Sequence, residues 1–126
     1  MPDGEGKGSA EERLARMVGR FAVAARAHQS SLEGLDDEGA AGHVRLLVGL
    51  YAAICREGDA GREAFLLLLE YDDDAVAGMA AVFSLKSEPE RALVVLRRLA
   101  AAGGLLGFRA GYAVELWEKG EWIPPA

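Results

Sequence analysis

Apolar residues recur at intervals of three and four positions in six successive stretches of the chain, which is the spacing of one buried helix face. These stretches predict helices over about residues 9–29, 37–57, 60–71, 75–85, 89–102 and 105–119. The second has the clearest stripe, which runs through Val44, Leu47, Val48, Tyr51 and Ile54. Strand-like alternation of polar and apolar residues is nearly absent. The pattern therefore predicts an all-α fold.

Residues suited to helix ends stand between these stripes. Gly58 is expected to end the second helix in a left-handed conformation, and Asp59 to cap the third helix directly after it. Asp36 or Asp37 can cap the second helix. In a capping box, a serine hydroxyl and a glutamate three residues later satisfy free backbone amides. This pattern occurs twice, as Ser9 with Glu12 and as Ser87 with Glu90.

Three consecutive aspartates, Asp72, Asp73 and Asp74, lie between the third and fourth predicted helices. Adjacent carboxylates suggest calcium, but an EF-hand loop needs a glycine at its sixth position and a closing glutamate. Neither follows Asp72 at the required spacing. Carboxylates at a helix start accept hydrogen bonds from free amides and interact favourably with the helix dipole. We therefore expect the aspartates to cap the fourth helix without a metal.

Residues 1–8 contain one proline and three glycines among charged residues, and they are expected to form a disordered leader. Residues 9–126 are expected to form a single all-helical domain, because a chain of 126 residues can bury roughly two-thirds of its unfolded surface. The tail after Gly120 contains two prolines and cannot continue a helix. Trp122 and Ile123 are expected to fold back over the last helix.

The formal net charge of −6 argues against nucleic acid as a partner, because a phosphate-binding surface needs clustered lysines and arginines. A basic protein is the more natural complement. The one cysteine, Cys55, excludes an internal disulfide framework and is expected to be a buried small apolar residue. The sequence shows no signal peptide and no apolar stretch long enough to cross a membrane. A cytoplasmic protein without membrane contact is therefore expected.

The third and fourth predicted helices resemble the fifth and sixth. At an offset of 28 residues, Ala64, Phe65 and Leu68 align with Ala92, Leu93 and Leu96. At an offset of 30 residues, Val76 and Ala80 align with Leu106 and Ala110. A helix-pair repeat of about thirty residues is typical of helical solenoids, whose units bury their apolar stripes by stacking.

Five motifs between about Val44 and Trp122 extend this comparison, and they read Gly58–Arg62, Phe65–Leu69, Ala80-Ala81, Pro89–Ala92 and Leu116–Gly120. They resemble five features of a small bacterial HEAT-like family. In chain order, these features are a Gly-Asp-x-x-Arg turn, a Leu-rich helix, an Ala-Ala helix, a Pro-Glu-Arg-Ala helix start, and closing Leu, Trp and Gly residues. That family is known as domain of unknown function 2019.

Two departures from the family pattern make this copy more acidic. Residues Tyr71–Asp74 replace a turn that often carries proline or asparagine, and Ala77 stands where a basic residue commonly follows the valine. The resemblance implies a HEAT/ARM-like α/α superhelix of about six helices in three antiparallel hairpins. It supplies no catalytic residue and no cofactor.

His28 and His43 could approach each other across the first hairpin, but a metal site needs further ligands at suitable spacing. Both are expected to be surface residues at helix ends. The glycine-rich segment Gly103–Gly107 precedes a helix, where an anion could bind. It follows a helix rather than a strand, which argues against a phosphate-binding loop. The sequence thus predicts no metal, no cofactor and no catalytic residue.

Candidate binding residues flank the stripes of the even-numbered helices, which line the concave side of a solenoid. Arg109 and Tyr112 fall on one side of the sixth helix, and both residue types are enriched at binding hot spots. Asp72, Asp73 and Asp74 are expected at the rim of the same groove.

The leading hypothesis is a non-enzymatic protein–protein interaction module, for example a bacterial immunity protein that neutralises a basic toxin or nuclease, or a regulatory protein. The alternative is a small-molecule-binding protein or enzyme with a pocket between helices. In that case Tyr112, Arg109 or His43 would contribute the polar groups. The sequence leaves the identity of the partner and the oligomeric state open.

Overall fold

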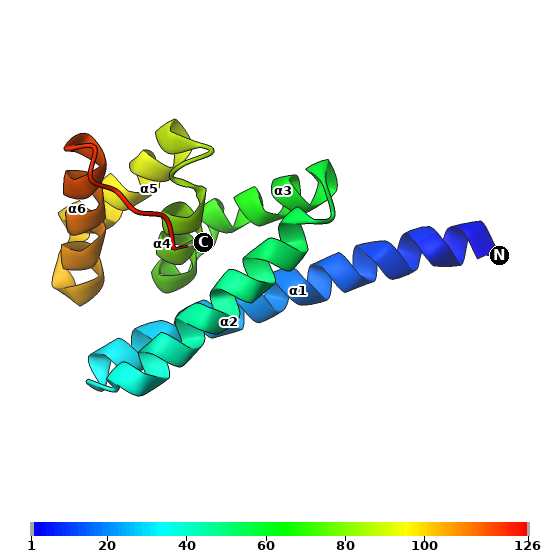
Figure 1. The fold of residues 1–126 in the computed structure, drawn as a ribbon, viewed down its shortest axis with the longest axis horizontal. Coiled ribbons are helices and arrows are strands. Elements are labelled where there is room, and N and C mark those ends of the chain that lie inside the picture. Colours follow the sequence, from blue (N-terminus) through cyan, green and yellow to red (C-terminus); the bar gives the residue numbers. More distant parts are fainter. Residues whose placement is uncertain (1, 126) are drawn as a thin grey trace.

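The chain is almost entirely helical in the computed structural model, which describes residues 2–125 and, from Gly8 onward, their side chains (Figure 1). Within this range the helices are α1 (Pro2–Glu33), α2 (Asp37–Cys55), α3 (Asp59–Leu66), α4 (Asp74–Ser84), α5 (Pro89–Ala102) and α6 (Gly104–Glu118). A short 3-10 helix, Leu67–Glu70, extends α3. The described residues form no strand, so the predicted all-α class is confirmed.

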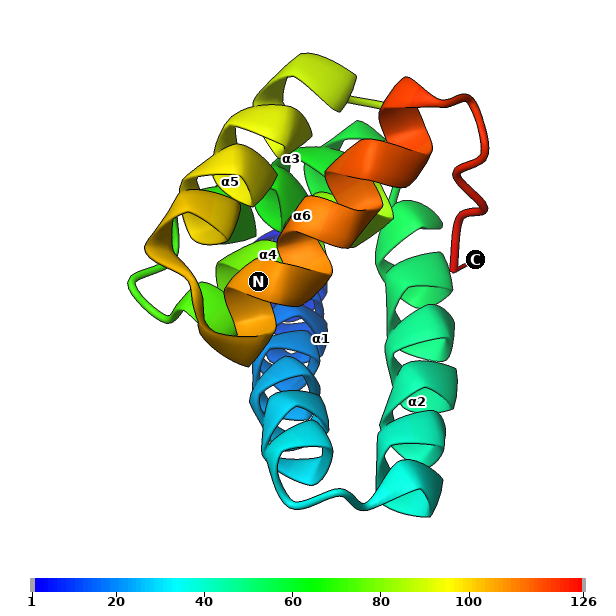
Figure 2. The ribbon, with the colours of Figure 1, turned by 90° about the vertical axis from the view of Figure 1, so that its left-hand side faces the viewer.

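The helices follow one another in three successive pairs. α1 and α2 form a long hairpin, α3 with its 3-10 extension packs against α4, and α5 packs against α6 (Figures 1 and 2). The pairs join mainly through α4, which lies against α1 on one side and α5 on the other. This order of contacts is that of the α/α superhelix predicted from the repeat.

Four aromatic rings, one from each of the first four helices, meet in the core. The ring of Phe21 lies edge-on to those of Phe65 and Phe83, with centroids 4.8 Å and 5.4 Å away. The ring of Tyr51 lies 4.9 Å from Phe65 and 5.2 Å from Phe83. Each such pair contributes about 0.5–1.5 kcal/mol beyond the burial of its area. The cluster therefore ties α1, α2, α3 and α4 into one core.

The first helix starts earlier than the sequence predicts. α1 begins at Pro2, so the stretch 1–8 is helical from its second residue, and Met1 lies outside the described residues. Ser9 is inside the helix and does not cap it. Proline suits the first helical position, and lengthening an existing helix requires no new nucleation.

Two other helix starts also differ from prediction. Gly58 has the expected positive φ of 76°. However, Gly58 and not Asp59 occupies the cap position of α3. Asp59 is the first residue of the helix, and its carboxylate pairs with Arg62. The Ser87 hydroxyl donates to the carbonyl oxygen of Ser84, so the second capping box does not form. In both cases the cap position lies one residue away from the side chain that could have filled it, at Gly58 instead of Asp59 and at Glu88 instead of Ser87.

The tail after α6 turns back toward the other helices, as Figure 2 shows in red. The amide of Glu121 donates to the carbonyl oxygen of Leu116 over 2.8 Å, and Trp122 packs against the core. The predicted return of Trp122 is therefore correct, whereas Ile123 stays exposed to solvent. Among the described helices, none is both long enough and apolar enough to span a bilayer.

Candidate functional site

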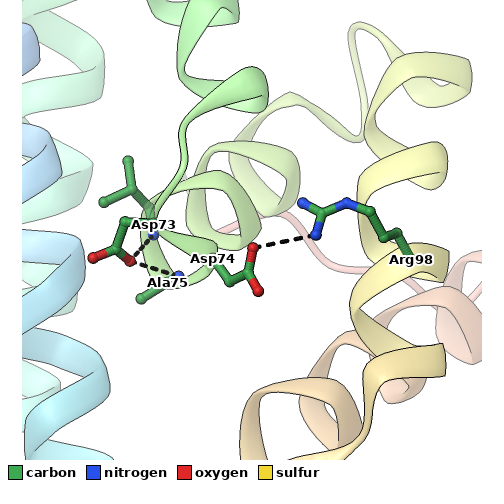
Figure 3. Close-up of polar contacts among 5 residues, drawn as sticks. Asp73, Asp74, Ala75 and Arg98 are labelled. Carbon is green, nitrogen blue, oxygen red and sulfur yellow. Dashed lines mark hydrogen bonds and ion pairs between the residues drawn. The ribbon is translucent and has the colours of Figure 1, made fainter.

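Two of the three aspartates, Asp73 and Asp74, make different polar contacts (Figure 3). The Asp73 carboxylate accepts hydrogen bonds from the amides of Ala75 at 2.9 Å and Val76 at 3.3 Å, and so caps α4. Asp74 pairs with Arg98 of α5 at 3.2 Å. Asp72 is exposed. The capping predicted for this turn is thus made by Asp73.

Replacing Asp73 with alanine is expected to lower the free energy of unfolding by about 1 kcal/mol, because the first amides of α4 lose their acceptor. Asp72→Ala is the matched control, since it removes the same charge from a side chain that has no hydrogen bond or ion pair among residues 8–125. Its effect should stay below about 0.5 kcal/mol. Urea denaturation measures both, and equal losses would show that charge, rather than capping, matters here.

A cavity of about 390 Å³ lies between α1, α4 and α6. Its size is within the range of small-molecule sites, roughly 300–1,000 Å³. Most of its wall is apolar and includes Met79 and Val82 of α4, Leu99 of α5, and Leu106 and Leu116 of α6. The stripes of neighbouring helices therefore leave space between them here instead of closing completely.

The cavity brings together two of the five predicted binding residues. Arg109 and Tyr112 line it, as their common side of α6 suggested. None of the three aspartates is part of the wall, although Ala75, the residue after Asp74, is. The Asp73 carboxylate bonds to the start of α4, and the Asp74 carboxylate pairs with α5. The expected acidic rim is therefore not formed around this cavity. Within the described residues, no group of three or more His, Cys, Asp or Glu side chains is arranged to hold a metal ion.

His28 lines the same cavity and is only 5% exposed, so the predicted surface position is wrong. α1 continues to Glu33, and His28 therefore lies within the helix rather than at its end. Burial lowers the pKa of His28 below its usual value of 6.5, and the nearby charges of Arg109 and His43 lower the pKa further. The imidazole is consequently neutral at pH 7. His43, which the sequence suggested beside Arg109 and Tyr112 as a polar group of a pocket, is not part of this wall.

Trp122 closes part of the cavity from the tail. Its indole Nε1–H is buried and has no acceptor among the residues that the structure describes. Most buried donors in proteins are paired, so an unpaired one beside a cavity is an unusual feature. The sequence could predict that Trp122 folds back, but not that its donor would lack a partner.

Two aromatic side chains of α6 project beside the cavity. Phe108 is 74% exposed and Tyr112 is 57% exposed, and both belong to the cavity wall. They are four residues apart and so lie on the same face of the helix, with Arg109 next to Phe108. The sequence analysis missed Phe108. The signal was available, because Phe108 falls outside the buried stripe and a large exposed aromatic residue needs an explanation.

A smaller cavity of about 230 Å³ lies on another part of the molecule, between α2, α3 and the end of α4. Tyr51, half-buried Cys55 and Ser84 contribute to its wall, so the prediction of a buried Cys55 is only partly right. Burial raises the pKa of the Tyr51 phenol above its usual value, and the neighbouring thiol of Cys55 raises the pKa further. The Ser84 hydroxyl has no partner among the described residues. Four charged side chains line this cavity, those of Asp59, Arg62, Glu63 and Glu88, and it lacks the exposed aromatic side chains of the first cavity.

Comparison with known proteins finds a structure of similar fold and assigns no role to the residues of the cavity. No protein-family model matches the chain, and no curated protein matches it in sequence. One solved structure that resembles it is the crystal structure of the protein RPA1889 from Rhodopseudomonas palustris CGA009. The two share 20% sequence identity with a TM-score of 0.77, over 88% of this chain and 93% of the other. At this identity the likeness shows that the fold is shared.

Proposed function

We propose that this chain is a non-enzymatic protein-interaction module, whose partner contacts the face of α6 formed by Phe108, Arg109 and Tyr112. The observation that carries the proposal is the exposure of two aromatic side chains beside an apolar cavity. Exposed aromatic surface that surrounds a hollow is typical of protein-binding sites. Tyrosine and arginine are also the residue types that contribute most at such sites.

The partner that we propose is a basic protein. The net charge of −6 attracts a positively charged protein over long distances and speeds its encounter. Contact would then be made through the aromatic residues of α6. Membership of the HEAT-like family named above, a cytoplasmic location and an immunity or regulatory role are further parts of this proposal. They rest on the sequence motifs and on the charge.

Site-directed photo-crosslinking tests the proposed face. A photoreactive phenylalanine analogue replaces Phe108 in the full chain, expressed in the organism that encodes it. The control carries the analogue at Val94, which is 68% exposed on α5 and lies outside the cavity wall. We expect a discrete adduct with one protein at position 108 and none at position 94. Identical adducts at both positions, or no adduct at 108, would contradict the proposal.

An adduct is then checked with purified proteins. Isothermal titration should show that Phe108→Ala and Tyr112→Ala each weaken binding of the cross-linked partner by about tenfold or more, as hot-spot residues do. Val94→Ala should leave the affinity unchanged.

A further inference from the structure

Three polar side chains in the wall of the 390 Å³ cavity have no partner in the described part of the chain. The indole Nε1–H of Trp122 is buried without an acceptor. His28 is almost fully buried, and neither it nor Arg109 makes a side-chain hydrogen bond within residues 8–125. Arg109 is an exposed residue of the wall, whereas buried polar groups such as the indole N–H of Trp122 usually find protein or ligand partners. The gathering of the three side chains in one cavity points to a bound molecule.

The chemistry of these groups defines what such a molecule must offer. Arginine and the tryptophan indole only donate hydrogen bonds, and a neutral histidine donates one. Among the described residues that line the cavity, Arg109 is the one ionised side chain, and none of them is an aspartate or glutamate that could neutralise it. The ion pairs made by other arginines, such as Arg97 and Arg98, have no counterpart at Arg109 among the described residues. The matching group is therefore an anionic acceptor.

The apolar residues of the wall indicate the chemical character of the rest of the ligand. Met79, Val82, Leu99 and Leu106 present apolar surface, so burying an apolar body there is favourable. Guanidinium binds the two oxygens of a carboxylate side by side, which gives this anion a geometric advantage. We infer that the cavity binds a small organic carboxylate with an apolar body, its carboxylate at Arg109 and its body between α4 and α6.

This inference goes beyond the proposed function, because it concerns a small ligand in the cavity and not the protein partner on the exposed face of α6, although Arg109 belongs to both sites. Three probes with the same eight-carbon chain test it: octanoate, octanol and octylammonium. Isothermal titration gives the affinity of the full chain for each. We expect octanoate to bind about tenfold tighter than octanol, and octylammonium to bind more weakly than both. The net charge of −6 by itself would favour the cation, so the opposite order isolates the local effect of Arg109.

A spectroscopic readout places the ligand. The chain has two tryptophans, and Trp122 belongs to the cavity wall whereas Trp117 does not. In a proton–nitrogen correlation spectrum, octanoate should shift the indole N–H signal of Trp122 and leave that of Trp117 in place. Met79→Trp fills the cavity from α4 and should abolish octanoate binding.

Arg109→Met removes the charge and keeps an extended side chain. We expect it to remove the preference for octanoate over octanol, while Arg109→Lys should keep part of it. Arg91→Met is the control, because it makes the same change of net charge at an exposed arginine of α5 outside the cavity wall. Both arginines replaced here, Arg109 and Arg91, are exposed, and melting temperatures without ligand verify that each of the three variants folds.

Each of four results would overturn the inference. These are octanoate binding no tighter than octanol, no binding of any probe, an unmoved Trp122 signal, and an equal loss of octanoate preference in Arg109→Met and Arg91→Met. None of these results affects the cross-linking experiment at position 108. Conversely, the absence of a protein adduct there leaves the binding of octanoate as a separate finding.

Discussion

Replacing Phe21 with alanine is expected to lower the free energy of unfolding by about 3–5 kcal/mol, the usual loss when a large buried ring is removed. Phe21 has 0% exposure, and its ring lies edge-on to the rings of Phe65 and Phe83. The substitution removes two aromatic pairs and leaves a cavity where α1, α3 and α4 meet. Whole domains are often only 5–15 kcal/mol more stable than their unfolded state, so the variant should be strongly destabilised.

Urea denaturation followed by far-ultraviolet circular dichroism measures this loss. Val23→Ala, two residues further along α1 and 59% exposed, is the matched control and should change the stability by less than about 0.5 kcal/mol. A loss below about 1 kcal/mol for Phe21→Ala would mean that the aromatic cluster does not hold the first four helices together.

The sequence predicts most of the fold because helix periodicity depends on local spacing. Phe21 and Ala25 are four residues apart in the first predicted helix and so fall on one face of it, and both are buried. The sequence could not show that Phe21 would be the centre of a cluster. That position depends on Tyr51, Phe65 and Phe83, which come from three other helices and meet only in the folded chain.

Helix ends are less predictable because several residues can serve as caps. Near Asp36 and Asp73 the expected aspartates do accept amide hydrogen bonds. Asp59 and Ser87 have suitable chemistry, but neither occupies the cap position, which is held by Gly58 before α3 and by Glu88 before α5. Local patterns thus indicate that a helix starts nearby, and tertiary packing decides which residue starts it.

The candidate site was predicted only in part for a similar reason. The common side of Arg109 and Tyr112 follows from their spacing within one helix, and the structure places both in the cavity wall. The burial of His28 depends on α1 packing with helices that lie far along the chain, so no local pattern reveals it. The unpaired indole of Trp122 is likewise a result of the folded tail.

Glycines at helix contacts illustrate the same limit. Gly61 lies in the Gly58–Arg62 motif, where the sequence gives no reason for a second glycine. In the structure Gly61 is buried and lies directly against the end of α2. A Cβ atom at Gly61 would overlap the carbonyl oxygen of Ile54 and lie 3.0 Å from the Cβ atom of Glu57. The absence of a side chain at Gly61 is therefore what allows α3 to approach α2 so closely.

Gly61→Ala is accordingly expected to lower the free energy of unfolding by about 3 kcal/mol, the upper part of the range for overpacking. The loss exceeds the gain in helix propensity of roughly 1 kcal/mol, because a backbone carbonyl cannot rotate away as a side chain can. Gly49→Ala provides the opposite control: Gly49 is exposed within α2 with nothing within 4 Å of its added Cβ, so this variant should gain about 0.5–1 kcal/mol. Urea denaturation measures the stability of both variants. The same glycine-to-alanine change should destabilise the protein at Gly61, where the new methyl group meets backbone, and stabilise it at Gly49, where it meets nothing. A stabilised Gly61→Ala variant would show that α3 can move away from α2 at little cost.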